Sequence, residues 1–454
     1  MRGKRYELDM CSGTIANKIL VFALPLMLSG MLQLLFNAAD IVVLGRFCGK
    51  ESLAAVGSNT SLINLFINLF VGLSVGANVV VAQDLGAGRE KEANRAVHST
   101  ILIAIISGVF LLVMGQLLSR QMLEWMDSPA TVIDLAALYL KVYFLGMPAT
   151  MVYNFGAAML RAKGDTQRPL YYLTLAGVIN VVLNFIFVVF MHWDVAGVAA
   201  ATSISQYVSA ALVLRCLRKE TGVLHLEWKQ LGFDRQVFVR IVKVGLPAGL
   251  QGVVFSLANV VIQSGVNSFG DVMVAGASAA ASVEGFVYVA MNSFYQAAIT
   301  FTGQNYGAGK CDRVDKIALY CTAFAVGSGL ILGNLVYFAG PQLISIYSPG
   351  DPAVVEAGMI RMGMIARTYA LCGVMEAMVG VLRGLGHSIG PMVVSLFGSC
   401  VLRLIWMVTV FPAVATPGIL FLAFPVTWII TGGCHLIFFW RVRKKCNRLV
   451  GYQV

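Results

Sequence analysis

The sequence of 454 residues is too apolar for a soluble protein, because hydrophobic residues make up 58% and charged residues only 12%, against roughly 25% charged residues in a soluble domain. The formal net charge of +11 would suit nucleic acid, but the Lys and Arg residues are spread over alternate connections, so we exclude a nucleic-acid partner. The sequence has no GxxxxGK[ST] motif, so it predicts neither bound ATP nor a nucleotide cofactor.

Twelve apolar segments follow one another along the chain, each about long enough to cross a hydrocarbon core of ~30 Å as a helix. Lipid cannot satisfy open backbone groups, so each segment is expected to be an α-helix. The predicted spans are residues 15–43, 53–81, 94–118, 133–160, 169–190, 196–217, 237–267, 273–303, 314–338, 352–382, 391–413 and 416–440. The predicted class is an all-α polytopic membrane protein with twelve transmembrane helices.

The distribution of Lys and Arg predicts the orientation of these helices. The basic residues gather at the two termini and in the connections after even-numbered spans, whereas the other connections carry only Arg46, Lys50 and Arg120. Basic loops stay in the cytoplasm, so we expect both termini to be cytoplasmic and the protein to lie in the inner (plasma) membrane.

Three pairs of similar segments show an internal duplication. Residues 160–169 resemble 382–391, residues 83–88 resemble 304–309, and Leu24-Pro25 resembles Leu246-Pro247, all at offsets of 221 or 222. Each half then holds six helices and starts on the same side, which makes the halves parallel repeats. We predict two six-helix lobes around a central cavity. The predicted segments are an N-terminal lobe (1–217), a cytoplasmic linker (218–236), a C-terminal lobe (237–440) and a basic cytoplasmic tail (441–454).

Polar residues inside the first lobe form two aligned sets. Gln33, Asn37 and Asp40 share one face of the first helix, and Asn180 and Asn184 lie one turn apart in the fifth. Further polar positions are Asn154 in the fourth helix and Thr202 and Gln206 in the sixth. One carboxylate among amide and hydroxyl oxygens suits a partly dehydrated Na⁺, whereas a proton needs only Asp40. The alternatives are that Asp40 lies near the outer end of its helix and is merely solvated, and that the asparagines and hydroxyls simply hold helices together.

The chain is similar to the multidrug and toxic compound extrusion (MATE) family over nearly its whole length. The similarity is carried by Asp40, Gly45, residues 54–57, residues 83–88, Asn154, Leu160, Arg161, residues 164–166, Asn180, Asn184, residues 304–309 and residues 382–384. It implies cation-coupled export of small amphipathic, often cationic, organic compounds by alternating access. In related transporters, the residues that match Asp40, Asn154, Asn180, Asn184 and Thr202 form the coupling site for Na⁺ or H⁺; some relatives carry an acid where Asn184 stands.

The second lobe contains a different set of intramembrane charges. Glu284, Tyr288, Met291 and Tyr295 share a face of the eighth helix, which would suit a flat lipophilic cation or, alternatively, ordinary packing. Additional candidate substrate or cavity residues are Tyr369, Glu376 and Arg403, with Arg403 placed to neutralise one of the acids.

Pro25 and Pro247, inside the first helix of each lobe, are candidate hinges, although a static bend would also account for them.

Two alternative functions would require different features in the sequence. A lipid-linked precursor flippase of the same superfamily would need extra helices or a strongly cationic cavity. A membrane enzyme would need a cluster of catalytic side chains at one face, yet the five histidines are dispersed. We therefore expect a monomeric antiporter without catalytic residues, cofactor or bound metal other than Na⁺ near Asp40, with small organic substrates and the lipid bilayer as its partners.

Overall fold

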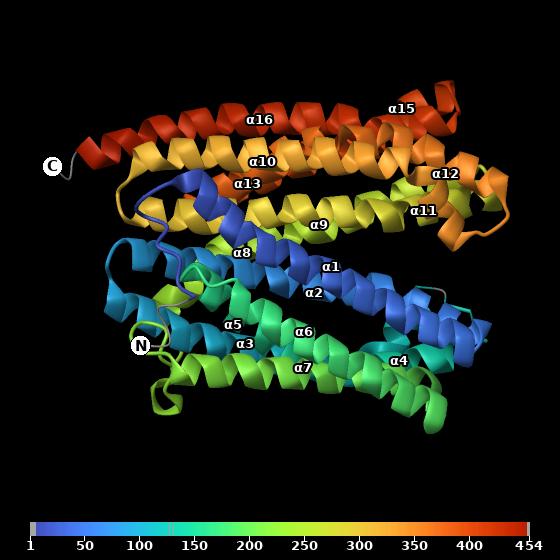
Figure 1. The fold of residues 1–454 in the computed structure, drawn as a ribbon, viewed down its shortest axis with the longest axis horizontal. Coiled ribbons are helices and arrows are strands. Elements are labelled where there is room, and N and C mark those ends of the chain that lie inside the picture. The colour runs from blue at the N-terminus through green and yellow to red at the C-terminus, as the bar shows by residue number, and fades with distance from the viewer. Residues whose placement is uncertain (1–5, 127, 130, 452–454) are drawn as a thin grey trace. The chain divides into compact units, whose positions relative to one another are not determined.

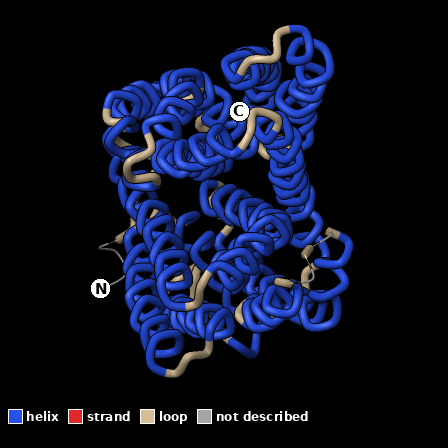
Figure 2. The backbone as a smooth tube through the Cα atoms, turned by 90° about the vertical axis from the view of Figure 1, so that its right-hand side faces the viewer, coloured by secondary structure: helices blue, strands red, loops and turns tan. Residues whose placement is uncertain are grey.

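A computed structural model describes residues 6–126, 128–129 and 131–451. Every regular element among these residues is a helix, and loops are confined to short connections (Figure 2). The chain forms two compact units: residues 6–9 with Leu28–Gly249 form unit 1, and Met10–Met27 with the chain from Leu250 onward form unit 2. Each unit is described by itself.

Two long helices contribute to both units. In α1 (Ile15–Phe47) the change from unit 2 to unit 1 falls between Met27 and Leu28, and in α8 (Arg235–Asn267) the change from unit 1 to unit 2 falls between Gly249 and Leu250. The compact units thus divide the chain inside these helices, and not at the connection that follows residue 217. Pro25 and Pro247 lie inside α1 and α8, two residues before each of these changes.

The remaining elements follow in chain order (Figure 1). Unit 1 contains α2 (Lys50–Gly86), α3 (Glu90–Trp125), α4 (Ile133–Leu145), α5 (Met147–Ala162), α6 (Gln167–Asn184), the π-helical segment η2 (Phe185–Phe190), α7 (Asp194–Lys219) and the 3-10 helix η3 (Trp228–Gln230). Unit 2 contains α9 (Asp271–Gly307), α10 (Cys311–Phe338), α11 (Gly340–Tyr347), α12 (Pro352–Met364), η4 (Ala366–Thr368), α13 (Tyr369–Gly384), α14 (Ile389–Ser395), η5 (Leu396–Val401), α15 (Leu402–Ala413) and α16 (Pro417–Gly451).

The count of membrane spans confirms the sequence prediction. Eleven helices in the described part of the chain are long and apolar enough to cross a membrane, or twelve when the bent pair α4 and α5 counts as one span. These two helices meet at 47°, where Pro148 at the start of α5 cannot donate a helical hydrogen bond. The repeat is visible in helix lengths: α1 and α8 both have 33 residues, and α2 and α9 both have 37.

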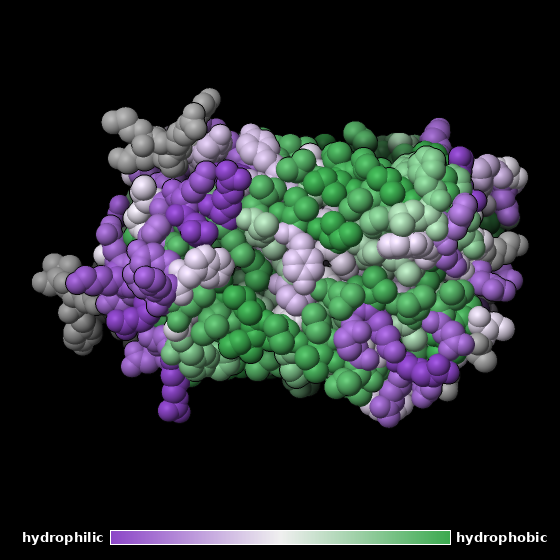
Figure 3. Space-filling view, turned by 90° about the horizontal axis from the view of Figure 1, so that it is seen from below, coloured by the Kyte–Doolittle hydropathy of each residue, from purple (hydrophilic) through white to green (hydrophobic). Residues whose placement is uncertain are grey.

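The outer surface is apolar in the way a lipid-facing surface must be. Leu117, Phe190 and Phe338 are each at least 75% exposed, which water would not favour. On the face drawn in Figure 3, hydrophobic residues cover the middle and hydrophilic residues gather at the two ends. One boundary differs from prediction: α16 continues through the basic segment to Gly451, while residues 452–454 of the predicted tail lie outside the described residues.

Candidate functional site

Asp40 lies in a chain of hydrogen-bonded polar side chains contributed by α1, α6 and α7 of unit 1. Asn184 Nδ2 donates to Asp40 Oδ1 and also to Asn180 Oδ1, the latter at 3.3 Å. Asn180 Nδ2 donates in turn to Thr202 Oγ1 at 3.2 Å. Asn180 and Asn184 are 5% and 0% exposed. The structure therefore joins four of the five predicted coupling residues directly, and we call these four the Asp40 cluster.

The Asp40 cluster offers oxygen atoms to a hard cation. Asn184 Oδ1 is buried without a hydrogen-bond partner, and an orphan buried acceptor of this kind needs an explanation. Carboxylate, amide and hydroxyl oxygens are the ligands that hard cations prefer. Among the described residues no group of three or more His, Cys, Asp or Glu side chains could hold a metal ion. A Na⁺ ion here would depend on the asparagines and Thr202.

Local structure fixes the position of these side chains. Asn180 and Asn184 are one turn apart on α6, and the π-helical segment η2 begins directly after Asn184; such segments are frequent at functional sites. Thr202 Oγ1 donates to the Val198 carbonyl oxygen at 3.0 Å, which leaves its lone pairs for Asn180. The Asp40 cluster thus depends on the packing of α6 against α7.

The other polar residues predicted for the first lobe lie apart from this chain of hydrogen bonds. Asn154 Nδ2 donates to the Thr150 carbonyl oxygen of its own helix at 2.8 Å. Gln33 and Asn37 are exposed on α1. Gln206, one turn after Thr202, has a buried Oε1 without a hydrogen-bond partner, so it is a second orphan acceptor on α7.

In unit 2, Glu284 is buried and paired with Arg361, which the sequence analysis had not connected. Arg361 donates to Glu284 Oε2 from Nε at 3.1 Å and from Nη2 at 3.0 Å. Glu284 is 1% exposed and its Oε1 has no hydrogen-bond partner. The spacing of 77 residues between the partners gave no sequence signal for this pair. Its negative charge is already balanced.

The rest of the predicted α9 face is divided between interior and surface. Met291 is fully buried, whereas Tyr288 is 40% exposed. The Tyr295 hydroxyl accepts a hydrogen bond from Arg383 Nη1, and Arg383 Nη2 donates to Gln251 Oε1 at 2.8 Å. This face is therefore partly occupied by protein contacts.

The predicted ion pair of Arg403 with an acid is wrong. Arg403 Nε donates to Thr427 Oγ1 at 3.2 Å, and the guanidinium lies 4.2 Å from the centre of the Phe424 ring. No ion pair within the described part of the chain includes Glu376, which is 8% exposed. Tyr369 stacks on Trp428 at 5.5 Å. An aromatic ring and a hydroxyl thus surround Arg403 where a carboxylate was expected.

The motif at residues 164–166 is part of an ion network between the α5–α6 turn and the end of α7. Asp165 Oδ1 accepts from the backbone N–H groups of Gln167 and Arg168, both at 3.1 Å. Arg168 and Lys163 both pair with Glu220. Burial acts to raise the pKa of Glu220, but these two cations hold that pKa below its ordinary value.

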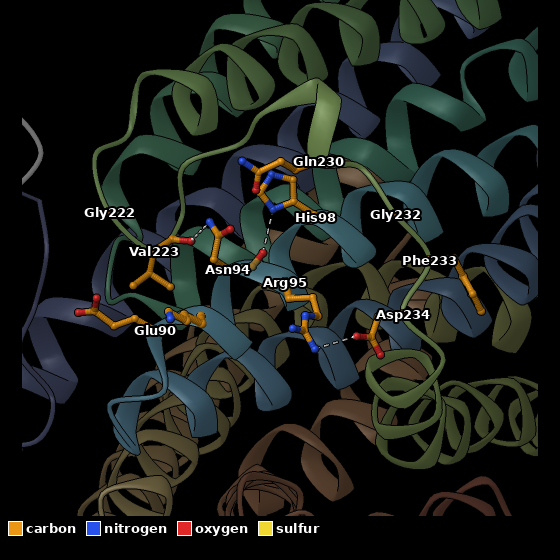
Figure 4. Close-up of a pocket in the computed structure, with 11 residues that line it drawn as sticks. Glu90, Asn94, Arg95, His98, Gly222, Val223, Gln230, Gly232, Phe233 and Asp234 are labelled. Carbon is orange, nitrogen blue, oxygen red and sulfur yellow. Dashed lines mark hydrogen bonds and ion pairs between the residues drawn. The ribbon is translucent and has the colours of Figure 1, made fainter.

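A cavity of about 640 Å³ lies between the start of α3 and the connection to α8 (Figure 4). Asn94 Nδ2 donates to the Val223 carbonyl oxygen at 2.8 Å, and the Glu227 backbone N–H donates to His98 Nε2 at 3.0 Å. Arg95 and Asp234 pair at 3.5 Å. The cavity contains no predicted site residue, and its polar contacts hold the connection against α3.

Comparison with known proteins shows the family. The sequence pattern of the MatE family matches residues 25–186 and again residues 247–409. The two matches begin 222 residues apart (247 − 25 = 222), which confirms the duplication. The chain belongs to the MatE family. A probable multidrug resistance protein, YoeA of Bacillus subtilis, is 27% identical over 387 residues, or 83% of each chain.

Relatives of this MatE chain include a protein named for a different substrate. A FAD transporter of Shewanella oneidensis is 24% identical over 440 residues, covering 94% of this chain and 95% of that protein. A crystal structure of MATE in complex with MaL6 superimposes with a TM-score of 0.90 over 97% of this chain and 98% of that one, at 21% identity. The structural similarity supports the fold alone.

Removal of the amide at position 184 tests the Asp40 cluster. Asn184→Leu is expected to weaken the apparent cation affinity by roughly 10- to 100-fold, because a hydrogen bond to a charged group contributes about 1.5–3 kcal/mol. The measurement is cation-driven efflux at graded Na⁺ concentration and pH. Asn334→Leu is the matched control, since Asn334 is half-buried and its side chain donates to the Leu330 carbonyl oxygen of its own helix. Equal behaviour of the two variants would contradict the assignment.

Proposed function

We propose that this MatE chain exports small amphipathic organic compounds, drugs among them, in exchange for inward flow of Na⁺ or H⁺. Membership of a family with multidrug resistance relatives supports drug export. The single observation that supports cation coupling is the Asp40 cluster, where a membrane-embedded carboxylate meets amide and hydroxyl oxygens. Ionisable groups in membrane spans commonly mark ion pathways. The chain acts as a transporter and not as an enzyme.

Coupling follows if the cation and the substrate favour different conformations. The changes of unit within α1 and α8 lie next to Pro25 and Pro247. A proline removes a helical hydrogen bond and allows a bend, so these two helices are where relative motion of the units would be absorbed. Alternating access is the mechanism we infer.

A proton and a sodium ion would require different orientations of the Asn184 side-chain amide. Its Nδ2 faces Asp40, and this arrangement leaves the second carboxylate oxygen, Oδ2, for a proton. Sodium would require a half-turn of the amide, which exchanges its nitrogen and oxygen. The buried Asn184 Oδ1 without a partner then becomes a ligand. The coupling ion is therefore a question for measurement with each gradient alone.

Reconstituted vesicles provide the test of this function. Vesicles are loaded with a lipophilic fluorescent cation, a sodium gradient is imposed at constant pH, and a pH gradient is imposed separately at constant sodium. We expect one of the two gradients to drive efflux at least about tenfold above that of empty vesicles. If neither does, for any compound of a panel of cationic and neutral drugs, the proposal is wrong.

A flavin nucleotide is the second candidate substrate. A FAD transporter is similar along almost the full chain, and in unit 2 the buried Arg383 and Arg403, together with the half-buried Arg361, stand against two buried glutamates. A net positive interior would suit phosphate groups. Flavin nucleotide efflux in the same vesicles, without efflux of cationic drugs, would favour this candidate. The flippase alternative is not favoured, because the described chain holds no more than twelve spans.

The proposed orientation predicts which residues are accessible from each side. A cysteine in place of Lys229, exposed in the connection before α8, should be labelled only from the cytoplasm. One in place of Trp193, 47% exposed between η2 and α7, should be labelled only from outside. A membrane-impermeant maleimide applied to intact cells and to inside-out vesicles measures both. Labelling of both positions from one side would contradict the predicted topology.

A further inference from the structure

The cavity of about 640 Å³ at the start of α3 lies at one end of a membrane span. Its volume falls within the ~300–1,000 Å³ typical of small-molecule sites, and none of its lining residues belongs to the Asp40 cluster. Ser99 Oγ, on α3, donates to the Gly232 carbonyl oxygen at 2.9 Å and accepts from the Asp234 backbone N–H at 3.2 Å. These bonds, together with those of Asn94 and His98, fix the connection to α8 as one wall of the cavity.

The cavity is lined by charges of both signs in equal number. The charged lining residues are two bases and two acids: Lys91, Arg95, Glu90 and Asp234. His98 adds no charge in this arrangement, because its Nε2 accepts from the Glu227 backbone N–H and its Nδ1 must then donate to the Asn94 carbonyl oxygen. Charge complementarity therefore favours a ligand that carries one positive and one negative group.

The two acids are not equally available to a ligand. Asp234 Oδ1 caps α8 by accepting from the backbone N–H groups of Gln236 and Val237 at 2.8 and 3.1 Å. Asp234 Oδ2 lies 3.5 Å from Arg95 Nη1. Glu90 is exposed in the first turn of α3, lies on the other side of Arg95 in the view of Figure 4, and forms no ion pair within the described part of the chain. Glu90 is thus the carboxylate that remains for a cationic group.

The two bases are placed to bind one anionic group together. Lys91 and Arg95 are one helical turn apart on α3, so their side chains are neighbours, and both are exposed. An ammonium and a guanidinium side by side suit a phosphate group. Glu90, next to Lys91 in the chain, suits a primary ammonium group on the same ligand. A phosphate joined to a primary ammonium by a two-carbon link is the headgroup of phosphatidylethanolamine.

An apolar face of α3 leads from the cavity into the membrane. Val113 follows Arg95 by 18 residues, about five full turns of a helix, so the two lie on the same side of α3. Ile106, Phe110 and Val113 are each at least 47% exposed. Phe233, in the wall of the cavity, is 55% exposed, as is common for aromatic rings at the level of lipid headgroups. A lipid whose headgroup occupies the cavity can therefore lay its acyl chains along this face.

From these observations we propose that the cavity at the start of α3 binds phosphatidylethanolamine. The phosphate lies between Lys91 and Arg95, the ammonium group contacts Glu90, and the acyl chains follow α3 into the bilayer. In the proposed orientation this lipid belongs to the inner leaflet, and it contacts the connection between the two halves of the chain. Binding needs no transport, so its test is independent of the proposed function.

Lipid binding to the purified full chain in detergent tests the proposal. The probes are phosphatidylethanolamine, phosphatidylcholine and phosphatidylglycerol with identical dioleoyl chains, and native mass spectrometry counts the bound lipid. Phosphatidylcholine has a methylated ammonium that cannot donate hydrogen bonds, and phosphatidylglycerol has no cation. We expect phosphatidylethanolamine to bind about fivefold more tightly than either, since an exposed ion pair contributes up to about 1 kcal/mol. Equal binding of the three lipids, or preference for one of the other two, would overturn the assignment.

Substitutions at the charged residues locate the site. Glu90→Gln should abolish the preference for phosphatidylethanolamine over phosphatidylcholine, whereas Lys91→Gln combined with Arg95→Gln should weaken binding of both lipids by about fivefold. Glu92→Gln and Lys316→Gln are the matched controls, because both residues are exposed near the start of a helix and do not line the cavity. A preference that survives Glu90→Gln, or controls that lose as much as the site variants, would show that the lipid binds elsewhere.

Hydrogen exchange gives a second readout at the site itself. Phosphatidylethanolamine should slow exchange of the backbone amides in residues 222–234 and in the first turn of α3, where helix N–H groups have no helical acceptor. Phosphatidylcholine should do so less, and the start of α10 should exchange at the same rate with either lipid. Exchange that is unchanged in both segments by phosphatidylethanolamine would contradict the proposal.

Discussion

Asp40→Asn is expected to reduce cation-driven export to the level of empty vesicles, a loss of at least about 100-fold. The carboxylate is the only acid in the chain of hydrogen bonds that joins α1, α6 and α7. An amide keeps the shape but can neither gain a proton nor balance the charge of a sodium ion, and removing a contact of this kind costs on the order of 3 kcal/mol or more. The measurement is drug efflux by purified, reconstituted protein under each gradient.

Asp134→Asn is the matched control for Asp40→Asn. Asp134 is exposed, and its ion pair with Arg120 is on the surface, where such pairs contribute about 0–1 kcal/mol. This variant should export at the wild-type rate. Wild-type export by Asp40→Asn, or an equal loss in both variants, would remove Asp40 from the coupling role.

Arg361→Leu is expected to give the largest loss of stability, about 3–5 kcal/mol in the free energy of unfolding. It leaves the carboxylate of Glu284 buried and unpaired, and breaking a buried ion pair from one side costs this much. Glu284→Leu combined with Arg361→Leu should recover most of the loss, because well-packed hydrophobic residues can replace such a pair. Unfolding in denaturant is measured for the wild type, Arg361→Leu, Glu284→Leu and the double variant. Additive losses in the double variant would show that the pair is not a unit.

The same pair changes the expectation for substrate selectivity. From the sequence, Glu284 on the α9 face suggested a contact for lipophilic cations. Because Glu284 is 1% exposed and already paired with Arg361, we now expect Glu284→Gln to affect neutral and cationic compounds equally. Selective loss of cationic compounds would return Glu284 to the substrate site. Binding of one neutral and one cationic drug to the purified variant distinguishes the two outcomes.

The fold could be predicted from the sequence because its signals are local and repeated. Apolar length gave the spans, and the paired segments at offsets of 221 and 222 gave the two halves. The Asp40 cluster could also be predicted, since Asn180 and Asn184 lie one turn apart on one helix. The change of unit inside α1 and α8 could not be predicted, because no local sequence feature marks where a continuous helix passes from one set of neighbouring helices to another.

Contacts between distant segments were the part that the sequence did not reveal. Arg361 meets Glu284 across 77 residues, and Arg240 meets Asp84 across 156; periodicity within one helix contains no information on either. Arg403 was assigned to an acid because opposite charges in a membrane attract, but it lies over the Phe424 ring. The spacing of Gly72 and Gly76 was a usable signal for close helix packing that we had overlooked. A Cβ on Gly72 would lie only 2.2 Å from the Gly249 backbone nitrogen.

The central claim is that cation and substrate flows are coupled through Asp40, and the reverse reaction tests it most directly. Coupling is reciprocal, so a drug gradient imposed on vesicles without any cation gradient should drive Na⁺ or H⁺ across the membrane in the opposite direction. A pH-sensitive and a sodium-sensitive dye record this flow. The account predicts a drug-dependent signal from one dye with wild-type protein and none with Asp40→Asn. Drug movement without either signal, or an undiminished signal with Asp40→Asn, would contradict it.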